Sequence, residues 1–229
     1  MTYLWIGLLM LLSYFLGSIP SGLIIGKVFK NIDIRQFGSK NTGATNAIRV
    51  LGFKYGIFAF VFDMLKGALV ILLVFLIGDT SLYLIGERQI NISSIYGMVG
   101  VLGHVFPIYN NFKGGKAVAT SAGMIFAIEP LVAVIVLLIF LVMFLKTRIV
   151  SLSSTTAAIS ALLLFVLRVF VPNIFIYSLN SRFNVSTRIM DLVVVCILAT
   201  IIFIRHKANY KRLKLGTEYK FPTKQKKQS

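Results

Sequence analysis

The sequence has few charged residues and very few acidic ones. Only 14% of its 229 residues are Asp, Glu, Lys or Arg, and Asp and Glu together number 7. A soluble globular domain carries about 25% charged residues, so this composition argues against a soluble protein. Hydrophobic residues make up 57% of the chain and the mean hydropathy is +0.87. We therefore expect a membrane protein.

Cysteine is almost absent as well. The single cysteine, Cys196, lies inside an apolar run, which excludes an internal disulfide and a cysteine metal cluster. We expect no metal ion and no cofactor. The first residues, MTYLWIGLLM, lack the basic start and the small-residue cleavage site of a signal peptide, so we expect a retained membrane helix.

The charge that is present is strongly positive, with 24 Lys and Arg giving a net charge of +17. In a soluble protein this excess would suggest a nucleic-acid partner. Here the basic residues lie between or after apolar runs, where membrane topology and anionic lipids account for them. The expected partner is the lipid bilayer, and no nucleic acid is expected.

The apolar runs indicate membrane-crossing helices, each needing about 20 residues to cross about 30 Å of hydrocarbon. The clear runs are Tyr3–Ile25, Tyr55–Ile77, Ile149–Val171 and Ile189–Ile204, and a weaker run is Ile92–Tyr109.

A sixth apolar stretch, Ala117–Leu145, is interrupted by Glu129 and Pro130. As one straight helix it would be about 43 Å long, which exceeds the hydrocarbon core. As two helices it brings the total to seven, and the basic connections then all fall on one side. The sequence thus predicts an all-α polytopic membrane protein with about seven transmembrane helices, its N-terminus outside and its C-terminus cytoplasmic. A single span over 117–145 is the alternative.

Residues 1–218 are expected to form one membrane domain, and residues 219–229 a basic, disordered tail. Three unusual polar segments fall on the cytoplasmic side of this topology. The first is RQFGSKNTGATNAIRVLG, residues 35–52. Gly38 and Gly43 permit tight turns in which backbone N–H groups converge on an anion, and its hydroxyl, amide and basic side chains add donors. The alternative is a solvated basic loop.

The second segment is NFKGGKAVAT, residues 111–120. It departs from a nucleotide-binding P-loop because Ala117 replaces the required Ser or Thr, the earlier glycine is missing and no strand is expected before it. Two glycines, Lys116 and a helix N-terminus still favour a phosphate site. The alternative is a glycine turn with an interfacial lysine.

The third segment is RHKANYKRLKLGTE, residues 205–218. Helical spacing puts His206, Asn209 and either Arg212 or Leu213 on one face, where His206 is suited to orient or deprotonate a hydroxyl. The alternative is a histidine at the membrane interface.

Two features lie within the expected spans. Asp63 and Lys66 are three residues apart, which fits either a functional pair or a self-neutralising ion pair. In the first span GSIPSG, residues 17–22, interrupts the helix at Pro20 and provides small residues for close packing.

Taken together with GSIPSGLIIGK and GHVFPIY, these segments resemble the bacterial acyl-phosphate:glycerol-3-phosphate acyltransferases, from the first span to about Glu218. The resemblance implies a membrane-integral catalytic domain, residues 1–218, in the bacterial cytoplasmic membrane with its active site facing the cytoplasm. It implies transfer of a fatty acyl group from long-chain acyl phosphate to the 1-hydroxyl of glycerol 3-phosphate, giving lysophosphatidic acid and inorganic phosphate in the first step of phospholipid synthesis.

The resemblance also implies roles for matching residues. The implied catalytic residues are Ser39, Arg49, His206 and Asn209. The implied substrate-binding residues are Asn41, Gly43, Thr45, Gly114, Gly115, Lys116 and Glu218. The chain departs from the family pattern where relatives commonly have SGNPGATN and GGKG, reading SKNTGATN and GGKA instead.

The family resemblance leaves rival classes to weigh. Neither histidine begins the H-x-x-x-x-D motif of acyl-CoA-dependent enzymes, which favours the acyl phosphate donor. A transporter or flippase would need polar residues along a path through the membrane. A purely structural membrane protein would leave the glycine-rich loops without a purpose. The sequence leaves the acyl-chain preference, the general base, the order of substrate binding and the oligomeric state open.

Overall fold

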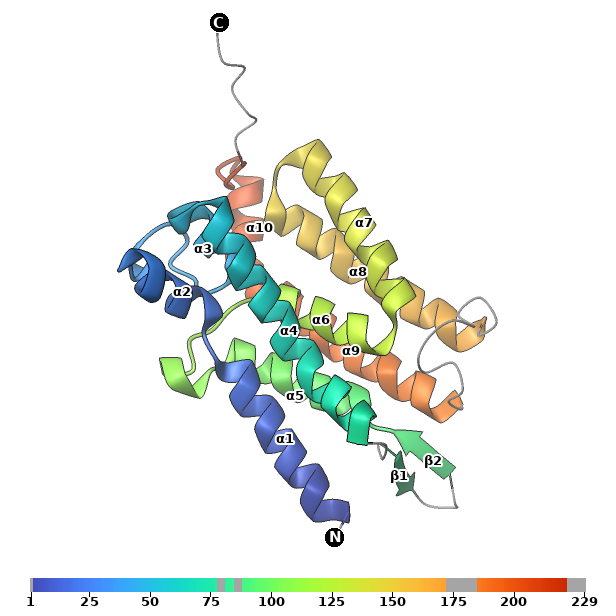
Figure 1. Ribbon diagram of the computed structural model, residues 1–229. Helices are drawn as coiled ribbons and strands as arrows, with labels where there is room; N and C mark the ends of the chain where they lie inside the picture. The colour runs from blue at the N-terminus through green and yellow to red at the C-terminus, as the bar shows by residue number, and fades with distance from the viewer. Residues whose placement is uncertain (1, 78–80, 85–87, 172–184, 222–229) are drawn as a thin grey trace, which may run out of the picture.

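The computed structural model describes residues 2–77, 81–84, 88–171 and 185–221, and it is dominated by helices (Figure 1). The helices are α1 (Thr2–Ser18), α2 (Ser21–Lys30), η1 (Ile34–Gln36), α3 (Ala44–Leu51), α4 (Phe53–Ile77), α5 (Ser93–Val105), η2 (Ile108–Asn110), α6 (Val118–Ile128), α7 (Pro130–Thr147), α8 (Val150–Phe170), α9 (Val185–Arg205) and α10 (Lys207–Lys214).

The first apolar run is broken where the sequence predicts. α1 ends at Ser18 and α2 begins at Ser21, with a bend of 43° between them. Pro20 lies at this break, where it lacks the N–H group that a continuous helix would use. The predicted interruption at Pro20 is confirmed.

The ambiguous stretch 117–145 forms two helices, as predicted. α6 ends at Ile128, Glu129 stands between the helices, and α7 begins at Pro130. Proline suits the first position of a helix because the N–H that it lacks has no partner there.

Membrane-crossing length is reached by some of these helices and not by others. In the described part of the chain, α4, α7, α8 and α9 are long and apolar enough to cross, and the bent pair of α1 and α2 raises the number from 4 to 5. α5 has 13 residues and α6 has 11. These lengths correspond to about 20 Å and 16 Å, which is shorter than the hydrocarbon core.

A short hairpin interrupts the helical pattern. Strands β1 (Ser81–Leu84) and β2 (Arg88–Asn91) pair antiparallel, with Ser81 opposite Asn91 and Leu84 opposite Arg88. The all-α prediction did not include this hairpin. Four-residue strands are too short to leave a clear alternating pattern in the sequence.

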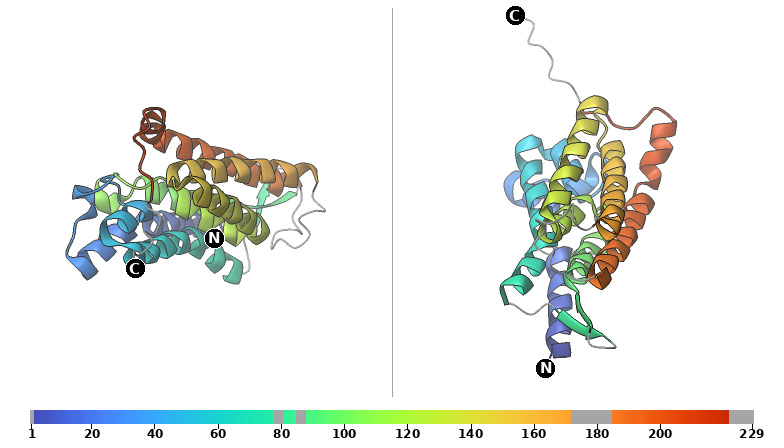
Figure 2. Two further views of the ribbon diagram at one scale, coloured as in Figure 1. Left: turned by 90° about the horizontal axis from the view of Figure 1, so that it is seen from above. Right: turned by 90° about the vertical axis from the view of Figure 1, so that its right-hand side faces the viewer.

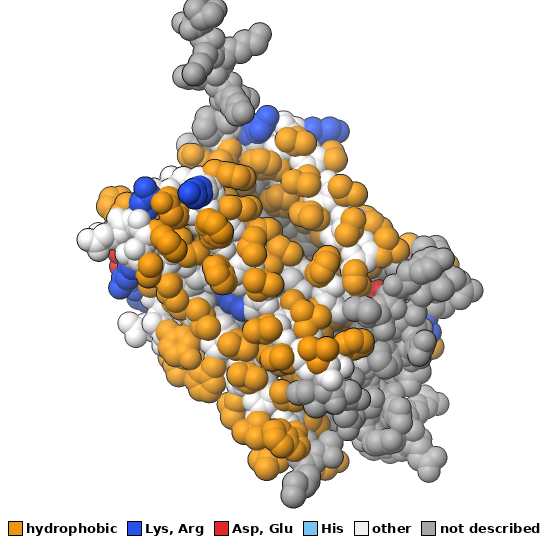
Figure 3. Space-filling view, viewed as in Figure 1, with side chains coloured by type: hydrophobic (Ala, Val, Ile, Leu, Met, Phe, Trp, Pro, Cys, Tyr) orange, Lys and Arg blue, Asp and Glu red, His pale blue; other side chains and the backbone are white. Residues whose placement is uncertain are grey.

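Apolar side chains both fill the interior and cover much of the outside. The largest buried cluster joins α4, α5, α6, α8 and α9 around Met124, Ile128 and Phe165. On α7 only Val132 is fully buried, although the helix is apolar along its whole length. Such a surface suits contact with lipid, and Figure 3 shows apolar side chains over most of this face.

An ionic cluster is buried among the helices. Arg168 on α8 lies 2.5 Å from Glu129 at the junction of α6 and α7, and 2.9 Å from Asp191 on α9. All three side chains are at most 2% exposed. The cation compensates the buried carboxylates and ties together the second half of the bundle.

The polar segments gather at one end of the molecule. α2, α3 and α10 lie at the end opposite the N-terminus and the hairpin (Figures 1 and 2). In Figure 3 the visible Lys and Arg side chains are concentrated toward that end. The bundle thus presents its predicted functional segments together.

Candidate functional site

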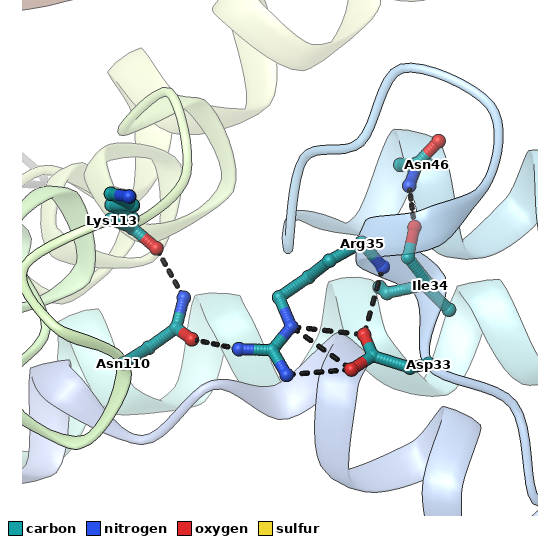
Figure 4. A network of polar contacts seen from close by, with 6 residues as sticks. All are labelled: Asp33, Ile34, Arg35, Asn46, Asn110 and Lys113. Atoms are coloured by element: carbon teal, nitrogen blue, oxygen red, sulfur yellow. Dashed lines mark hydrogen bonds and ion pairs between the residues drawn. The ribbon is translucent and has the colours of Figure 1, made fainter.

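The segment before α3 is held in place by Asn46. Its side-chain amide donates to the carbonyls of Ile34 at 2.8 Å, Asn41 at 2.9 Å and, more weakly, Phe37 at 3.3 Å. Its side-chain oxygen accepts from the Ser39 N–H at 2.8 Å. Asn46 is 1% exposed, so a single buried side chain determines the path of residues 34–41. Figure 4 shows its bond to Ile34.

Gly38 allows this arrangement. Its φ of +60° is rare for other residues, and a Cβ there would lie 2.4 Å from Oδ1 of Asn46. Asn41 then accepts from the Gly43 N–H at 2.8 Å, and Gly43 precedes the first turn of α3. Within the described residues, the hydroxyls of Ser39 and Thr45 have no hydrogen-bond partner, which leaves both available to a ligand.

Both departures from the family's glycine pattern have left-handed backbones. Lys40 has φ +58° and Ala117 has φ +69°. Glycine adopts such angles without the steric penalty of a Cβ. Lysine and alanine therefore place local backbone strain at these two positions.

The glycine loop packs tightly on His104 of α5. A Cβ on Gly115 would lie 1.9 Å from Nε2 of His104, and a Cβ on Gly114 would lie 2.1 Å from the His104 carbonyl. The Gly115 N–H donates to that same carbonyl at 3.1 Å. Arg205 donates to the carbonyls of Gly114 at 2.8 Å and Gly115 at 3.1 Å. The glycines thus serve close packing, and the Gly115 N–H points at protein rather than outward.

Lys116 starts a chain of hydrogen bonds across the site. Its Nζ donates to Oδ1 of Asn209 at 2.5 Å, and Nδ2 of Asn209 donates to Glu218 at 2.6 Å. The Glu218 carboxylate also accepts from Ser151 at 2.8 Å and Arg212 at 2.7 Å. Asn209 therefore links two other predicted site residues, Lys116 and Glu218, through direct hydrogen bonds.

Two titratable groups in this series of hydrogen bonds, Lys116 and Glu218, have shifted pKa values. Burial lowers the pKa of Lys116 to about 8, with Glu218 opposing the shift and Arg212 adding to it. Burial on its own would raise the pKa of Glu218, but hydrogen bonds from Asn209, Ser151 and Arg212 bring it below its usual value. Glu218 is therefore a fully engaged carboxylate at neutral pH.

His206 is buried near the charges of Lys116 and Glu218. Burial lowers the pKa of His206 to about 4, and the positive charge of Lys116 acts in the same direction. Nδ1 lies 2.8 Å from the Ile202 carbonyl. In the tautomer that donates this bond, Nε2 carries no proton and can accept one. A neutral imidazole of this kind is suited to orient a hydroxyl and is a weak base.

Arg49 lies in the last turn of α3, in a different segment from Lys116 and His206. Its guanidinium carbon lies 3.9 Å from the centre of the Tyr219 ring. Its Nε is buried, and within the described residues it has no hydrogen-bond partner. An unsatisfied buried donor on a cation is what an anionic ligand would complete.

The two predicted phosphate loops are joined by a network shown in Figure 4. Arg35 pairs with Asp33 at 2.6 Å and donates to Asn110 at 2.6 Å. The Asn110 side chain in turn donates to the carbonyl of Lys113. The arginine beside it holds the pKa of Asp33 at about 2, so the pair stays ionised. This network fixes the first loop relative to the second.

Asp63 and Lys66 form the predicted ion pair. The charged atoms are 2.8 Å apart, and Lys66 also donates to the Ile19 carbonyl at the helix break, again at 2.8 Å. His104 lies 3.6 Å from the same carboxylate. These side chains line a narrow polar cleft with Ser18, Ser21 and Thr42. The pair thus supports the region where the first span, α4 and the glycine loop meet.

Several contributing residues lay outside the predicted set. Asn46 was within the first segment but had no distinct role, and Arg205 adjoined His206 in the third. Ser151 and Tyr219 gave no local signal because their partners are 67 and 170 positions away along the chain. No group of three or more His, Cys, Asp or Glu able to hold a metal ion is found in the described ranges.

Comparison with known proteins gives a consistent match. A family model described as glycerol-3-phosphate acyltransferase matches residues 7–216. The glycerol-3-phosphate acyltransferase of Acholeplasma laidlawii is 40% identical over 225 residues, covering 98% of this chain and 96% of that protein. The enzyme of Enterococcus faecalis is 44% identical over 212 residues, covering 92% of this chain and 89% of that protein.

Two solved structures have the same architecture. Both are crystal structures of PlsY, an integral membrane glycerol 3-phosphate acyltransferase, one in a glycerol 3-phosphate form and one in a lysophosphatidic acid form. Each is 36% identical to this chain and covers 94% of it and 95% of its own length, with TM-scores of 0.77 and 0.75 respectively.

Proposed function

The chain belongs to the glycerol-3-phosphate acyltransferase family, and from that premise we propose that it transfers a fatty acyl group from acyl phosphate to the 1-hydroxyl of glycerol 3-phosphate. The products are lysophosphatidic acid and inorganic phosphate. This reaction supplies the first acylated intermediate of phospholipid synthesis.

The chemistry asks little of the protein beyond positioning. The acceptor oxygen attacks the acyl carbonyl carbon, the bond to the phosphate oxygen breaks, and phosphate leaves with the bonding electrons. The hydroxyl proton passes to a base. Because a mixed anhydride is already activated, the main tasks are to hold two anions, orient the hydroxyl and stabilise the developing oxyanion.

The observation that carries the proposal is the convergence of cations and amides from three separate segments at one end of the bundle. Lys116 bonds to Asn209, and its charge interacts with that of Arg49. Two phosphorylated substrates need more than one cationic group. We assign Lys116 and Arg49 to the phosphates, with Ser39, Asn41, Gly43 and Thr45 forming the wall of the first loop.

Four assignments follow from the hydrogen bonds and close contacts. Asn209 orients Lys116, and neutral His206 orients the acceptor hydroxyl, with the substrate's own phosphate as the other candidate base. Glu218 was expected to bind substrate, but its carboxylate accepts from three protein donors and would repel a phosphate. We therefore assign it to positioning Asn209 and Arg212. Gly114 and Gly115 act by letting the Lys116 loop approach His104.

We further propose seven membrane crossings, with the N-terminus outside, the C-terminus in the cytoplasm and the site facing the cytoplasm of a bacterial cell. The number seven counts the short helices α5 and α6 as crossings. Two features support the orientation. The segments that carry the site lie at the end opposite the N-terminus (Figure 1), and the visible Lys and Arg side chains are concentrated toward that end (Figure 3). An acyl chain would then lie in the bilayer while its phosphate reaches Lys116.

The function is tested by supplying purified protein with radiolabelled glycerol 3-phosphate and either acyl phosphate or acyl-CoA. Labelled lysophosphatidic acid from acyl phosphate alone is expected. No product from acyl phosphate would exclude the activity, and equal product from acyl-CoA would exclude the donor assignment.

The role of Lys116 is tested separately. Lys116→Ala is expected to raise KM with a smaller effect on kcat, while the matched control Lys113→Ala, whose exposed side chain makes no described contact, leaves both unchanged. A fall in kcat alone would contradict phosphate binding by Lys116. For topology, a cysteine at Lys113 in a chain lacking Cys196 should resist impermeant thiol reagents added outside.

A further inference from the structure

The segment after α10 folds back across the site as a strap, defined as residues Gly216–Phe221. The Glu218 carboxylate anchors its middle through bonds from Ser151, Asn209 and Arg212. At its end the Phe221 N–H donates to the Arg148 carbonyl at 2.9 Å, and the Phe221 ring lies 5.7 Å from that of Phe144. The strap is therefore fixed on both sides of Tyr219.

These anchors place Tyr219 against Arg49. The ring centre lies 3.9 Å from the guanidinium carbon, well within the range of a cation–π contact. Tyr219 also meets Phe221 edge-on, with ring centres 5.2 Å apart. Phe221 thus restrains the Tyr219 ring, and the Tyr219 ring in turn restrains the Arg49 guanidinium.

A ring stacked on the face of a guanidinium leaves its in-plane N–H groups available. Those groups form the planar fork that matches phosphate oxygens. Nε of Arg49 is buried and, in the described part of the chain, has no hydrogen-bond partner. The stack therefore restrains a donor that the protein itself does not satisfy.

From these contacts we propose that Tyr219 is a positioning residue, which holds the Arg49 guanidinium by stacking so that its N–H groups meet the phosphate of glycerol 3-phosphate. The inference rests on the proposed function for the identity of the ligand. Tyr219 acts through Arg49 and needs no contact with substrate. Both the ring of Tyr219 and its hydroxyl interact with the Arg49 guanidinium, and the proposal assigns the larger part to the ring.

The test compares Tyr219→Leu, Tyr219→Phe and the control Leu215→Ala. Leu215 follows α10, and its side chain is 65% exposed. Tyr219→Leu is expected to raise KM for glycerol 3-phosphate about 3- to 30-fold, the range of a cation–π contact, with kcat within about twofold. Tyr219→Phe, which keeps the ring and loses the hydroxyl, should raise KM less than Tyr219→Leu does. Leu215→Ala should leave KM unchanged, and the thermal melting midpoint should be the same in all three variants.

Two further measurements make the result specific. In an Arg49→Lys background, Tyr219→Leu should have little further effect, because the planar group on which the ring stacks is gone. Direct calorimetric binding of glycerol 3-phosphate should weaken by the same factor as KM rises. This binding measurement stands even if acyl phosphate is not the donor, so its failure is distinct from failure of the proposed reaction.

Several outcomes would overturn the proposal. A wild-type KM in Tyr219→Leu would show that the stack has no role. A lower KM or a higher kcat in Tyr219→Leu would show that the ring shields Arg49 from the substrate instead. The full effect persisting in Arg49→Lys, or a rise in KM in Tyr219→Phe as large as that in Tyr219→Leu, would show that Tyr219 does not act by stacking on Arg49.

Discussion

Replacing Asn46 with alanine tests how one buried amide organises the first loop. The change removes bonds to the Ser39 N–H and to the carbonyls of Ile34 and Asn41, all between 2.8 and 2.9 Å. Each contributes about 1 kcal/mol net. Ile34 is 0% exposed, and its carbonyl would keep only the weak 3.4 Å bond from the Phe37 N–H. We expect a loss of about 3 kcal/mol in the free energy that holds residues 34–41 in place.

The catalytic effect should exceed the effect on stability. A shift of Ser39 by about 1 Å is enough to reduce the rate about 100-fold. The assay is kcat and KM for lysophosphatidic acid formation, together with the thermal melting midpoint. Asn46→Asp should be at least as damaging, because it keeps the acceptor for Ser39 but turns a buried carboxylate toward the carbonyls that the amide now serves. The control Gln36→Ala removes an exposed side chain from the same segment and should change neither quantity. Wild-type kcat and melting in Asn46→Ala would refute the reasoning.

Three other predictions concern charge and backbone strain. Lys116 carries its charge below a pKa of about 8, so KM for glycerol 3-phosphate should rise as pH increases through 8. Lys116→Arg, which stays charged, should abolish that rise, and a rise that persists would exclude Lys116 as its source. Lys40 has φ +58°, so Lys40→Gly should raise the free energy of unfolding by about 1 kcal/mol in a detergent melting experiment; a destabilised variant would contradict the strain. Arg168→Met leaves the carboxylates of Glu129 and Asp191 buried without their cation. It should cost about 3–5 kcal/mol of stability, and an unchanged melting midpoint would argue against the ionic cluster.

The membrane architecture was largely readable from the sequence because its signals are local. Apolar runs define the long helices, and Pro20 and Pro130 mark the break in the first span and the start of α7. Crossing length was harder to judge. α5 and α6 are shorter than a span, since their flanking residues enter loops that pack on the site, and this length is set by tertiary contacts.

The first residues of the predicted tail, 219–229, make tertiary contacts that the sequence does not indicate. Residues Tyr219–Phe221 pack on α3 and on the end of α7, although the segment 219–229 is polar and basic by composition. Residues 222–229 lie outside the described residues. The boundary near Glu218 stays a prediction, and the packing of Tyr219 depends on a partner 170 positions earlier in the chain.

Candidate site residues could be identified from composition and spacing, but their partners could not. Lys116 and Asn209 each belong to a recognisable polar segment, whereas their 2.5 Å contact depends on how α6 and α10 pack. Gly114 and Gly115 were expected to form part of a phosphate site. The Gly115 N–H is instead used by His104, because the loop lies directly on that side chain.

The most direct test of the account is the initial-rate pattern when acyl phosphate and glycerol 3-phosphate are both varied. Lys116 and Arg49 converge from different segments, so the account predicts that both anions are bound together before transfer. Double-reciprocal lines should intersect, and no phosphate should be released without acceptor. Parallel lines with a burst of phosphate in the absence of glycerol 3-phosphate would indicate an acyl-enzyme and contradict direct transfer.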